Sequence, residues 1–317
     1  MINRNKIRNA LLSFPPIREL LFFILQKKVY KGSVDKKISA LLKGKLKLSE
    51  MKIDNLIVSL TSFPQRIDEV KYVIYSLLDQ TILPEKIILW LAESQFPNKE
   101  QDLPQDLLAF KEFGFTIEWC EDLRSYKKLI PALELFPDHY VVTADDDLYY
   151  KRDWLEKIWV THLKYPNNVV CHRPSKILLK NGDVLPKEQW KGNIRTGEES
   201  LLIYAGSGGG VLYHRKYLHK DVCKKDMFFN LAPHADDVWF YFMVIQKGTK
   251  MRGIKNPYFN TKWINPYREY GLINGHTLSS INIGGGLNDL QFKNVIDHYN
   301  IDLHSIFIKE VAHEHSI

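Results

Sequence analysis

Three consecutive carboxylates, Asp145 to Asp147, end an apolar, β-branched run that begins at His139. Because unpaired charges are costly to bury, this pattern predicts a buried central strand whose carboxyl end opens into a polar site. Adjacent acids repel one another, so their natural partner is a hard divalent metal that carries a phosphate-bearing substrate on its other coordination positions. A solvated acidic turn is the alternative, and the apolar run before the acids and Tyr149 and Tyr150 after them favour the metal site.

A second acidic pair, Asp236 and Asp237, stands immediately before a helical run rich in Trp and Phe that ends near Ile245. The pair can simply cap that helix, since a carboxylate at a helix N-terminus contributes roughly 0.5–2 kcal/mol. Alternatively, an acid at the mouth of an aromatic-walled pocket can take the proton of an acceptor hydroxyl. The sequence leaves both interpretations open.

A glycine cluster, Gly206 to Gly210, is too dense in glycine for regular structure and suits close approach of the backbone to a ligand. It lacks the spacing of a phosphate-binding loop or of a dinucleotide fingerprint. A flexible turn between two strands is the other interpretation. The long polar segment before it, 174–200, is expected to be a lid or to be disordered.

The elements that position these residues alternate between strands and helices. Strands are expected at 56–60, 86–91, 115–119 and 139–144, and helices at 66–80, 104–113 and 126–136. Crossovers of this length predict an α/β fold, a mostly parallel open sheet with helices on both faces. Ligands bind outside the carboxyl ends of such strands, which places Thr61, the loop near Asp122, and the acids 145–147 on one rim.

The net charge of +7 lies entirely in residues 1–50, which hold twelve Lys or Arg and three Asp or Glu. The remainder is slightly acidic, so we expect no nucleic-acid partner. This basic, apolar segment predicts either a helix at the membrane interface or a helical hairpin packed on the domain. No run reaches the roughly 18 apolar residues of a membrane span. Three scattered cysteines argue against disulfides and zinc, so we expect a cytoplasmic protein, at the inner face of the membrane where the segment binds lipid.

Four motifs occur in the order of a known family. They are TSFPQRI from Thr61, SLLDQ followed by a Pro-x-Lys-Ile strand between Ser76 and Ile87, Asp-Asp-Asp-x-x-Tyr from Asp145, and a later Asp-Asp-Val-Trp from Asp236. In this the chain resembles the GT-A (Rossmann-like) nucleotide-sugar glycosyltransferases, in particular the family-2-like enzymes of bacterial capsule and O-antigen synthesis. The resemblance spans roughly residues 55–299 and leaves the basic N-terminal segment outside it. We therefore expect a basic amphipathic helical segment, 1–50, before a glycosyltransferase domain, 51–317, with a nucleotide-binding half, 51–150, and an acceptor-binding half, 151–317.

The resemblance also implies roles for individual residues. It implies donor binding by Thr61, Arg66, Asp122, Lys128, Asp145 and Asp146. It implies a metal on Asp147, with Asp145 and His276 as further ligands, although a lone His in a Gly-rich loop is more often a surface residue. It implies acceptor contacts at Gly208, Gly209 and Gly210, and a catalytic base at Asp236 or Asp237. Arg124 and Ser125 replace a Gly-Pro of the family pattern, so the path of that loop is not carried over.

The chemistry implied is transfer of a sugar, a hexose by preference, from a nucleoside diphosphate sugar to a hydroxyl of a growing glycan or lipid-linked saccharide. Uridine diphosphate is the favoured carrier and Mn²⁺ or Mg²⁺ the cofactor. Attack assisted by one base predicts inversion at the anomeric carbon. Retention is the alternative, since the same fold also includes retaining enzymes that need no such base. Two other classes stay open: a metal-dependent nucleotidyltransferase or phosphohydrolase, and a non-catalytic membrane-associated scaffold in which the acids hold a structural cation.

Overall fold

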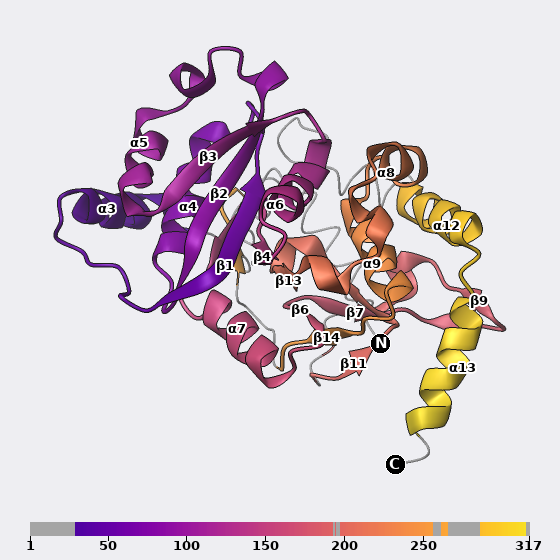
Figure 1. Ribbon diagram of the computed structural model, residues 1–317. Helices are drawn as coiled ribbons and strands as arrows, with labels where there is room; N and C mark the ends of the chain where they lie inside the picture. The colour runs from indigo at the N-terminus through magenta and orange to yellow at the C-terminus, as the bar shows by residue number, and fades with distance from the viewer. Residues whose placement is uncertain (1–28, 193, 195–196, 256–260, 266–285, 315–317) are drawn as a thin grey trace, which may run out of the picture.

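The centre of the molecule is an eight-stranded sheet, shown in the computed structural model of Figure 1. The structure describes residues 29–314 apart from 193, 195–196, 256–260 and 266–285. Across the sheet the strands lie in the order β11 (Glu199–Ser200), β14 (Met251–Gly253), β6 (Val169–Cys171), β13 (Val211–Tyr213), β4 (Tyr140–Thr143), β1 (Lys52–Thr61), β2 (Leu83–Ala92), β3 (Phe115–Cys120). Six run in one direction, whereas β13 and β11 are antiparallel to their neighbours.

The central strands are apolar because both of their faces are covered. Residues 56–60 of β1 and 141–143 of β4 are all buried, and continuous apolar runs are typical of parallel strands covered on both sides. The polar members of these runs find partners inside the sheet: the indole of Trp90 on β2 donates to Ser59 Oγ at 2.9 Å. The predicted α/β class with a mostly parallel sheet is therefore confirmed.

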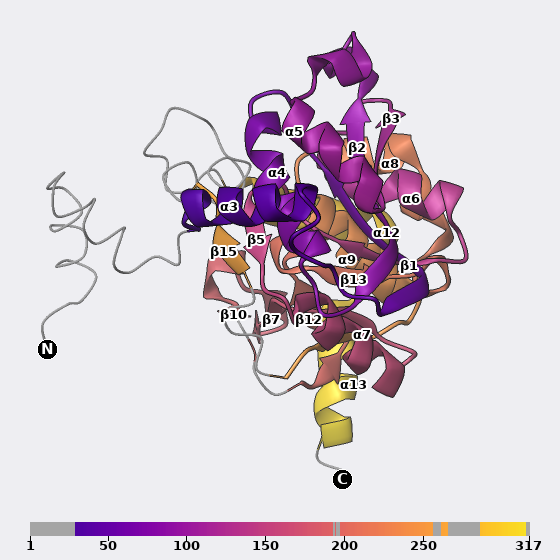
Figure 2. The same cartoon turned by 90° about the vertical axis from the view of Figure 1, so that its left-hand side faces the viewer.

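Helices of the N-terminal half gather around the strands β1 to β3. The helix α4 (Ile67–Leu78) links β1 to β2, and α3 (Lys31–Leu42) and α5 (Gln105–Leu108) lie beside it in Figures 1 and 2. The last helix of this half, α6 (Ile130–Leu135), follows a 3₁₀ turn, η4 (Arg124–Lys128). The sequence predicted one helix over 126–136 and another over 104–113. Each is instead a short α-helix joined to a 3₁₀ turn.

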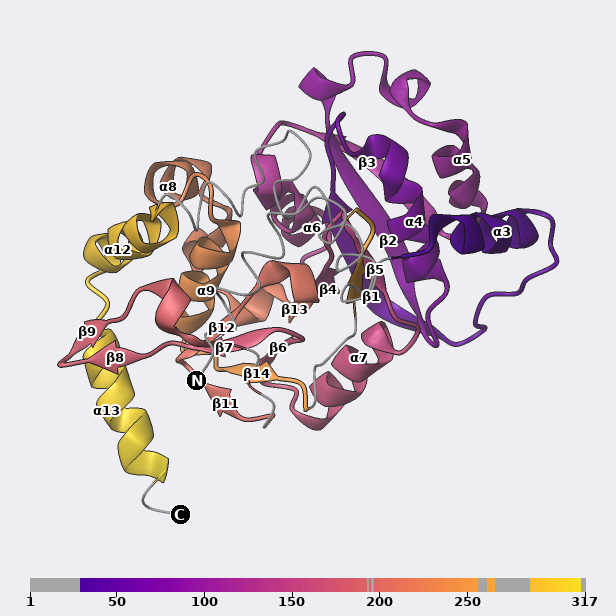
Figure 3. The same cartoon turned by 180° about the vertical axis from the view of Figure 1, so that it is seen from behind.

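Helices of the C-terminal half cover the other end of the sheet. Three of them, α8 (Lys225–Leu231), α9 (Asp236–Gln246) and α12 (Leu287–Tyr299), pack side by side in Figures 1 and 3, and α7 (Trp154–Lys164) packs near β6. The final helix, α13 (Leu303–Glu314), extends away from this group beside the hairpin of β8 (Leu179–Lys180) and β9 (Asp183–Val184). The helix α9 is buried along nearly all its length, which fixes its N-terminal acids in space.

The segment 174–200 was expected to be a lid or disordered, and its described part is ordered. It contains the β8–β9 hairpin, a turn η5 (Lys187–Gln189), and β7 (Pro174–Lys176), which pairs with both β10 (Lys191–Gly192) and β12 (Ile203–Ala205). These strands are two or three residues long, too short for a period to appear in the sequence.

Part of the basic N-terminal segment belongs to the folded body. The helix α3 buries Val34, Ile38 and Leu41 against the core, and its apolar face is therefore used inside the protein. Residues 1–28 lie outside the described part, so the predicted membrane contact stays a prediction for them. Among the described helices, none combines the length and apolar character required to cross a bilayer.

Two adjacent leucines test whether α3 is an integral part of the fold. Leu41 is 2% exposed and Leu42 is 40% exposed. We expect Leu41→Ala to lower the free energy of unfolding by about 2–4 kcal/mol, because it leaves a cavity, and Leu42→Ala to change it by less than about 1 kcal/mol. Urea unfolding followed by circular dichroism measures both. Equal losses would show that α3 does not pack as described.

Candidate functional site

The predicted acids follow β4 at one edge of the sheet. Since β1, β2, β3 and β4 are parallel, their carboxyl ends meet at this edge. Thr61 ends β1, Asp122 follows the end of β3, and Asp145 to Asp147 follow β4, so the structure brings these three parts of the chain to one rim as expected.

Asp146 and Asp147 are held by one arginine. Arg66 Nη1 lies 2.7 Å from Asp146 Oδ1 and 2.6 Å from Asp147 Oδ2, and Ser62 Oγ donates to Asp146 Oδ2 at 2.6 Å. Burial acts to lower the pKa of Arg66, but the two carboxylates outweigh it and raise the pKa. The Asp146 side chain is 8% exposed and that of Asp147 21%. Asp146 therefore anchors the turn from inside, while Asp147 faces the rim.

Asp145 is joined to the start of α9 by a buried lysine. Lys128 Nζ lies 3.0 Å from Asp145 Oδ1 and 3.1 Å from Asp236 Oδ2. Burial acts to lower the pKa of Lys128, but both carboxylates outweigh this effect and the pKa is raised well above its usual value. The backbone N–H of Asp145 donates to the Tyr150 hydroxyl at 2.7 Å, which fixes the acid from the other side. A protonated lysine thus bridges the two acidic motifs of the sequence.

The two acids of α9 have different surroundings. Asp236 is 8% exposed, and its burial raises its pKa despite Lys128. Asp237 is 20% exposed and lies 3.3 Å from Lys187 Nζ, which also donates to the Tyr204 hydroxyl at 3.1 Å. Burial acts to raise the pKa of Asp237, but Lys187, Tyr204 and Lys128 outweigh it and lower the pKa. Asp237 is therefore the acid of this pair that is both ionised and accessible.

The glycine cluster runs from β12 to β13 and crosses the edge of the sheet beside Asp145. Gly210 has φ +100°, and a Cβ there would lie 2.4 Å from Trp154 Cζ2. The Trp154 indole donates to the carbonyl of Gly209 at 2.7 Å. A Cβ on Gly208 would lie 2.7 Å from Asp145 Oδ2. The cluster is an ordered loop, and glycine is required because side chains would collide with the site.

Thr61 and Asp122, two further residues predicted from the sequence, form hydrogen bonds at the rim. Thr61 Oγ1 donates to the Trp90 carbonyl at 2.8 Å, and Asp122 accepts from Lys127 Nζ at 2.6 Å. Arg124, two residues on, donates to the Pro233 carbonyl at 3.0 Å, which places this loop beside the start of α9. His276 lies outside the described residues.

Four residues that contact the site had not been assigned a role in it from the sequence. Ser62 belongs to the TSFPQRI motif and could have been found there, and Tyr150 belongs to the Asp-Asp-Asp-x-x-Tyr turn. Lys187 and Arg173 carry no motif, because their positions depend on pairing between short strands far apart in the sequence.

The acids at the end of β4 suit a divalent cation that shares its coordination with a substrate. Within the described part of the chain, no three His, Cys, Asp or Glu side chains are grouped to hold a metal. Asp145 and Asp147 nevertheless present partly exposed carboxylates on either side of buried Asp146. Mg²⁺ commonly binds one or two carboxylates and takes its remaining ligands from phosphates and water, so this pair fits such an ion.

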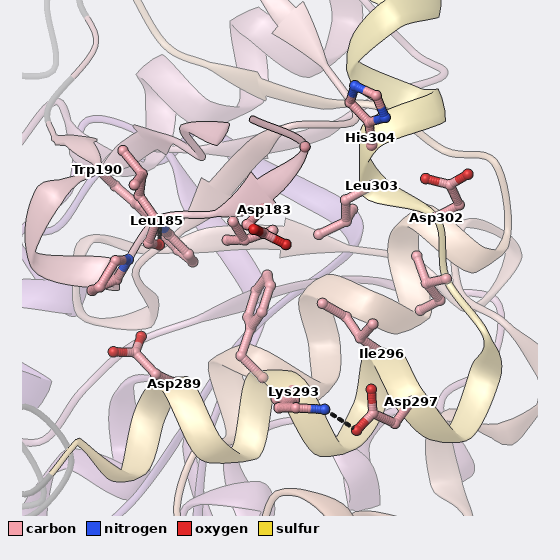
Figure 4. Close-up of a pocket in the computed structure, with 15 residues that line it drawn as sticks. Asp183, Leu185, Trp190, Asp289, Lys293, Ile296, Asp297, Asp302, Leu303 and His304 are labelled. Atoms are coloured by element: carbon pink, nitrogen blue, oxygen red, sulfur yellow. Dashed lines mark hydrogen bonds and ion pairs between the residues drawn. The ribbon is translucent and has the colours of Figure 1, made fainter. Parts of the chain in front are cut away.

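A cavity of about 420 Å³ lies on another face, between the β8–β9 hairpin, α12 and the start of α13 (Figure 4). Its wall includes Trp190 and Phe292, and four aspartates lie around it: Asp183, Asp289, Asp297 and Asp302. Asp289 also accepts from the backbone N–H of Lys187 at 3.1 Å. None of the predicted site residues that the structure describes lines the cavity, and Asp289 is its link to the segment that carries Lys187.

Comparison with known proteins gives a limited likeness. No protein-family model matches the chain, and no curated protein sequence is significantly similar to it. Among solved structures, S. aureus TarS 1–349 is 14% identical with a TM-score of 0.43, over 69% of this chain and 62% of that chain. The complex of TarS 1–349 with UDP-GlcNAc is 14% identical with a TM-score of 0.41, over 67% of this chain and 57% of that chain. The 4-diphosphocytidyl-2C-methyl-D-erythritolsynthase from Anaerococcus prevotii DSM 20548 is 12% identical with a TM-score of 0.44, over 70% of this chain and 94% of that chain. All three TM-scores lie below 0.5.

Gly210 and Gly248 form a matched pair for testing the loop geometry. Both have positive φ, +100° and +79°, but only at Gly210 would a Cβ meet other atoms. We expect Gly248→Ala to cost about 1 kcal/mol from backbone strain, and Gly210→Ala to cost about 3 kcal/mol or more from strain and collision together. Thermal unfolding measures the difference. If both variants lose the same stability, Trp154 does not close over the loop.

Lys128 can be tested by a double-mutant cycle. Lys128→Met leaves Asp236 buried without its cation, and we expect it to lower the free energy of unfolding by about 3–5 kcal/mol. Asp236→Asn should restore part of this loss in the double variant, because a neutral amide needs no cation. Denaturant unfolding at pH 7 measures all four proteins. Additive losses would contradict the bridge.

Proposed function

We propose that the protein is a glycosyltransferase that moves a sugar from a nucleoside diphosphate sugar to a hydroxyl of a glycan or lipid-linked saccharide. The observation that carries this proposal is the Lys128 bridge between Asp145 and Asp236. It sets an acid turn suited to a metal-bound diphosphate beside an acid pair suited to proton transfer. A sugar transferase needs these two functions next to each other, because the attacking acceptor oxygen and the departing phosphate oxygen lie on opposite sides of one anomeric carbon.

On the donor side, we propose that the rim formed by Thr61, Asp122 and Asp145 binds the nucleoside. Arg66 holds Asp146 and Asp147, and through them it fixes the shape of the turn. Lys128 adds positive charge near the phosphates. On the acceptor side, Gly208, Gly209 and Gly210 leave space for the sugar and for the incoming hydroxyl, since none of them projects a side chain.

For the cofactor, we propose Mn²⁺ or Mg²⁺ held by Asp145 and Asp147, with His276 as a further ligand. A divalent cation there would supply Lewis-acid stabilisation to the departing phosphate oxygens. The residues of the chain set its position: Asp146 stays bound to Ser62 and Arg66, so its two neighbours face the rim.

For the base, we propose Asp237. The acceptor oxygen forms a bond to the anomeric carbon while the bond from that carbon to the diphosphate oxygen breaks, and the electron pair leaves with the diphosphate. Asp237 takes the proton of the acceptor hydroxyl. Asp237 is the more exposed of the two acids, and Asp236, tied to Lys128, positions the start of α9. A single displacement of this kind inverts the anomeric centre.

The finer assignments are proposals of the same kind. We propose a uridine diphosphate sugar, a hexose by preference, as donor and a bacterial surface polysaccharide, such as capsule or O-antigen, as the product. Residues 1–28 carry most of the basic N-terminal charge, and we propose that they contact the inner face of an anionic membrane.

The proposed function can be tested by measuring which sugar nucleotides the protein cleaves. The protein is incubated with Mn²⁺, sugar nucleotides of uridine, guanosine, cytidine and thymidine, and saccharide acceptors, and nucleoside diphosphate release is measured. Donor-specific release stimulated by an acceptor is expected. In a parallel incubation with nucleoside triphosphates and sugar phosphates, release of pyrophosphate would instead identify a nucleotidyltransferase. No nucleoside diphosphate release across the donor panel would contradict the proposal.

The two acids of α9 provide the matched test of mechanism. We expect Asp237→Asn to lower kcat by about 100-fold or more while donor affinity changes little, because the variant cannot accept the proton. Asp236→Asn, which keeps the size of the side chain beside Lys128, should lower kcat by less than about ten-fold. Steady-state kinetics with donor binding by calorimetry separates the effects. The reverse order of losses would assign the base to Asp236.

A further inference from the structure

Arg173 lies at the same edge of the sheet as the acids. It follows β6, and β6 runs parallel to β4 because both are antiparallel to β13 between them. The backbone N–H of His172 donates to the Gly210 carbonyl at 3.1 Å, which ties the end of β6 to the glycine loop. Parallel strands end at one edge, so Arg173 faces the rim from two strands away.

Glycines lie between Arg173 and Asp145, so the loop places no side chain between these two residues. A Cβ on Gly208 would lie 2.7 Å from Asp145 Oδ2 and 3.7 Å from Arg173 Nη1. A Cβ on Gly209 would lie 2.5 Å from Arg173 Cγ. The two glycines therefore let a carboxylate and a guanidinium stand on either side of the loop backbone, next to the turn proposed to hold the metal.

Arg173 is not paired with a carboxylate among the described residues, unlike the other cations of the site. Arg66, Lys128 and Lys187 each lie within 3.3 Å of an aspartate oxygen. Across the described residues, Arg173 forms no ion pair. Its Nη2 donates to Thr261 Oγ1 at 2.8 Å, and its guanidinium lies 6.0 Å from the centre of the Trp263 ring. These contacts fix the side chain without neutralising it, and a fixed guanidinium is well suited to bind phosphate oxygens in pairs.

We propose that Arg173 binds the terminal phosphate of the donor diphosphate, opposite the acids at the end of β4. The proposal rests on the proposed function and deepens it. When the bond from the anomeric carbon to the phosphate oxygen breaks, negative charge grows on that phosphate, and Arg173 stabilises it. The role explains why the loop carries glycine at 208 and 209, since side chains there would fill the space between the two charges.

Binding of nucleotides tests this role apart from catalysis. Diphosphates of uridine, guanosine, cytidine and thymidine are titrated with Mn²⁺ by calorimetry, and the tightest is compared with its monophosphate. We expect Arg173→Gln to weaken the diphosphate by about ten-fold or more and the monophosphate by less than about three-fold, because only the terminal phosphate loses its partner. Arg173→Lys, which keeps the charge but not the paired geometry, should lie between Arg173→Gln and the unmodified protein.

Arg215→Gln is the matched control. Arg215 follows the other end of β13, at the opposite edge of the sheet, and bonds only to backbone carbonyls of His219 and Lys220 among the described contacts. It removes the same charge and should leave both affinities unchanged. Melting temperatures within a few degrees of the unmodified protein show that each variant folds, and if Arg173→Gln does not fold, Arg173→Lys decides the question alone.

The outcomes separate the two proposals. If the unmodified protein binds none of the four diphosphates, the proposed function fails, and the role of Arg173 fails with it. If it binds one of them and Arg173→Gln binds it equally well, or loses the monophosphate to the same degree, only the assignment of Arg173 is overturned. Equal losses in Arg215→Gln would also overturn it, because the effect would then reflect net charge.

Discussion

The candidate site depends on one buried cation, the ammonium of Lys128. It lies between Asp145 and Asp236, two acids that are far apart in the sequence. A buried lysine is stable only with such partners, and the acids in turn repel each other without it. The bridge therefore fixes the distance between the strand-end acids and α9 and contributes to the stability of the fold at the same time.

A second constraint comes from the crowding around the glycine loop. Trp154 packs against Gly210, and its indole donates a hydrogen bond to the carbonyl of Gly209. Arg173 also packs against Gly209. The loop is thus pressed against the edge of the sheet rather than standing free in solvent. Its backbone lies beside Asp145, and this arrangement brings the ends of β6 and β4 together although β13 separates the two strands.

The sequence was most informative where a pattern is local. The apolar run before Asp145 and the helical spacing after Thr61 predicted the strand ends and their common rim. The antiparallel insertion of β13 has no local signature, since three residues carry no period, and without it the position of Arg173 could not be inferred. The same holds for Lys187, which reaches Asp237 from a segment expected to be a lid or disordered. The membrane contact and the role of His276 concern residues that the structure does not describe.

The balance of charge gives a physical reason for a divalent cation in the proposed reaction. Around the two acidic motifs, the five aspartates Asp145, Asp146, Asp147, Asp236 and Asp237 face four cations, Arg66, Lys128, Lys187 and Arg173. Asp122, elsewhere on the rim, is paired with Lys127. Three of the four cations are already paired with aspartates. A diphosphate adds further negative charge beside the acids of β4, and Arg173 alone cannot offset it. A hard cation on Asp145 and Asp147 would neutralise the phosphates from one side, while Arg173 binds them from the other. The cation and the arginine therefore have complementary roles, and neither replaces the other.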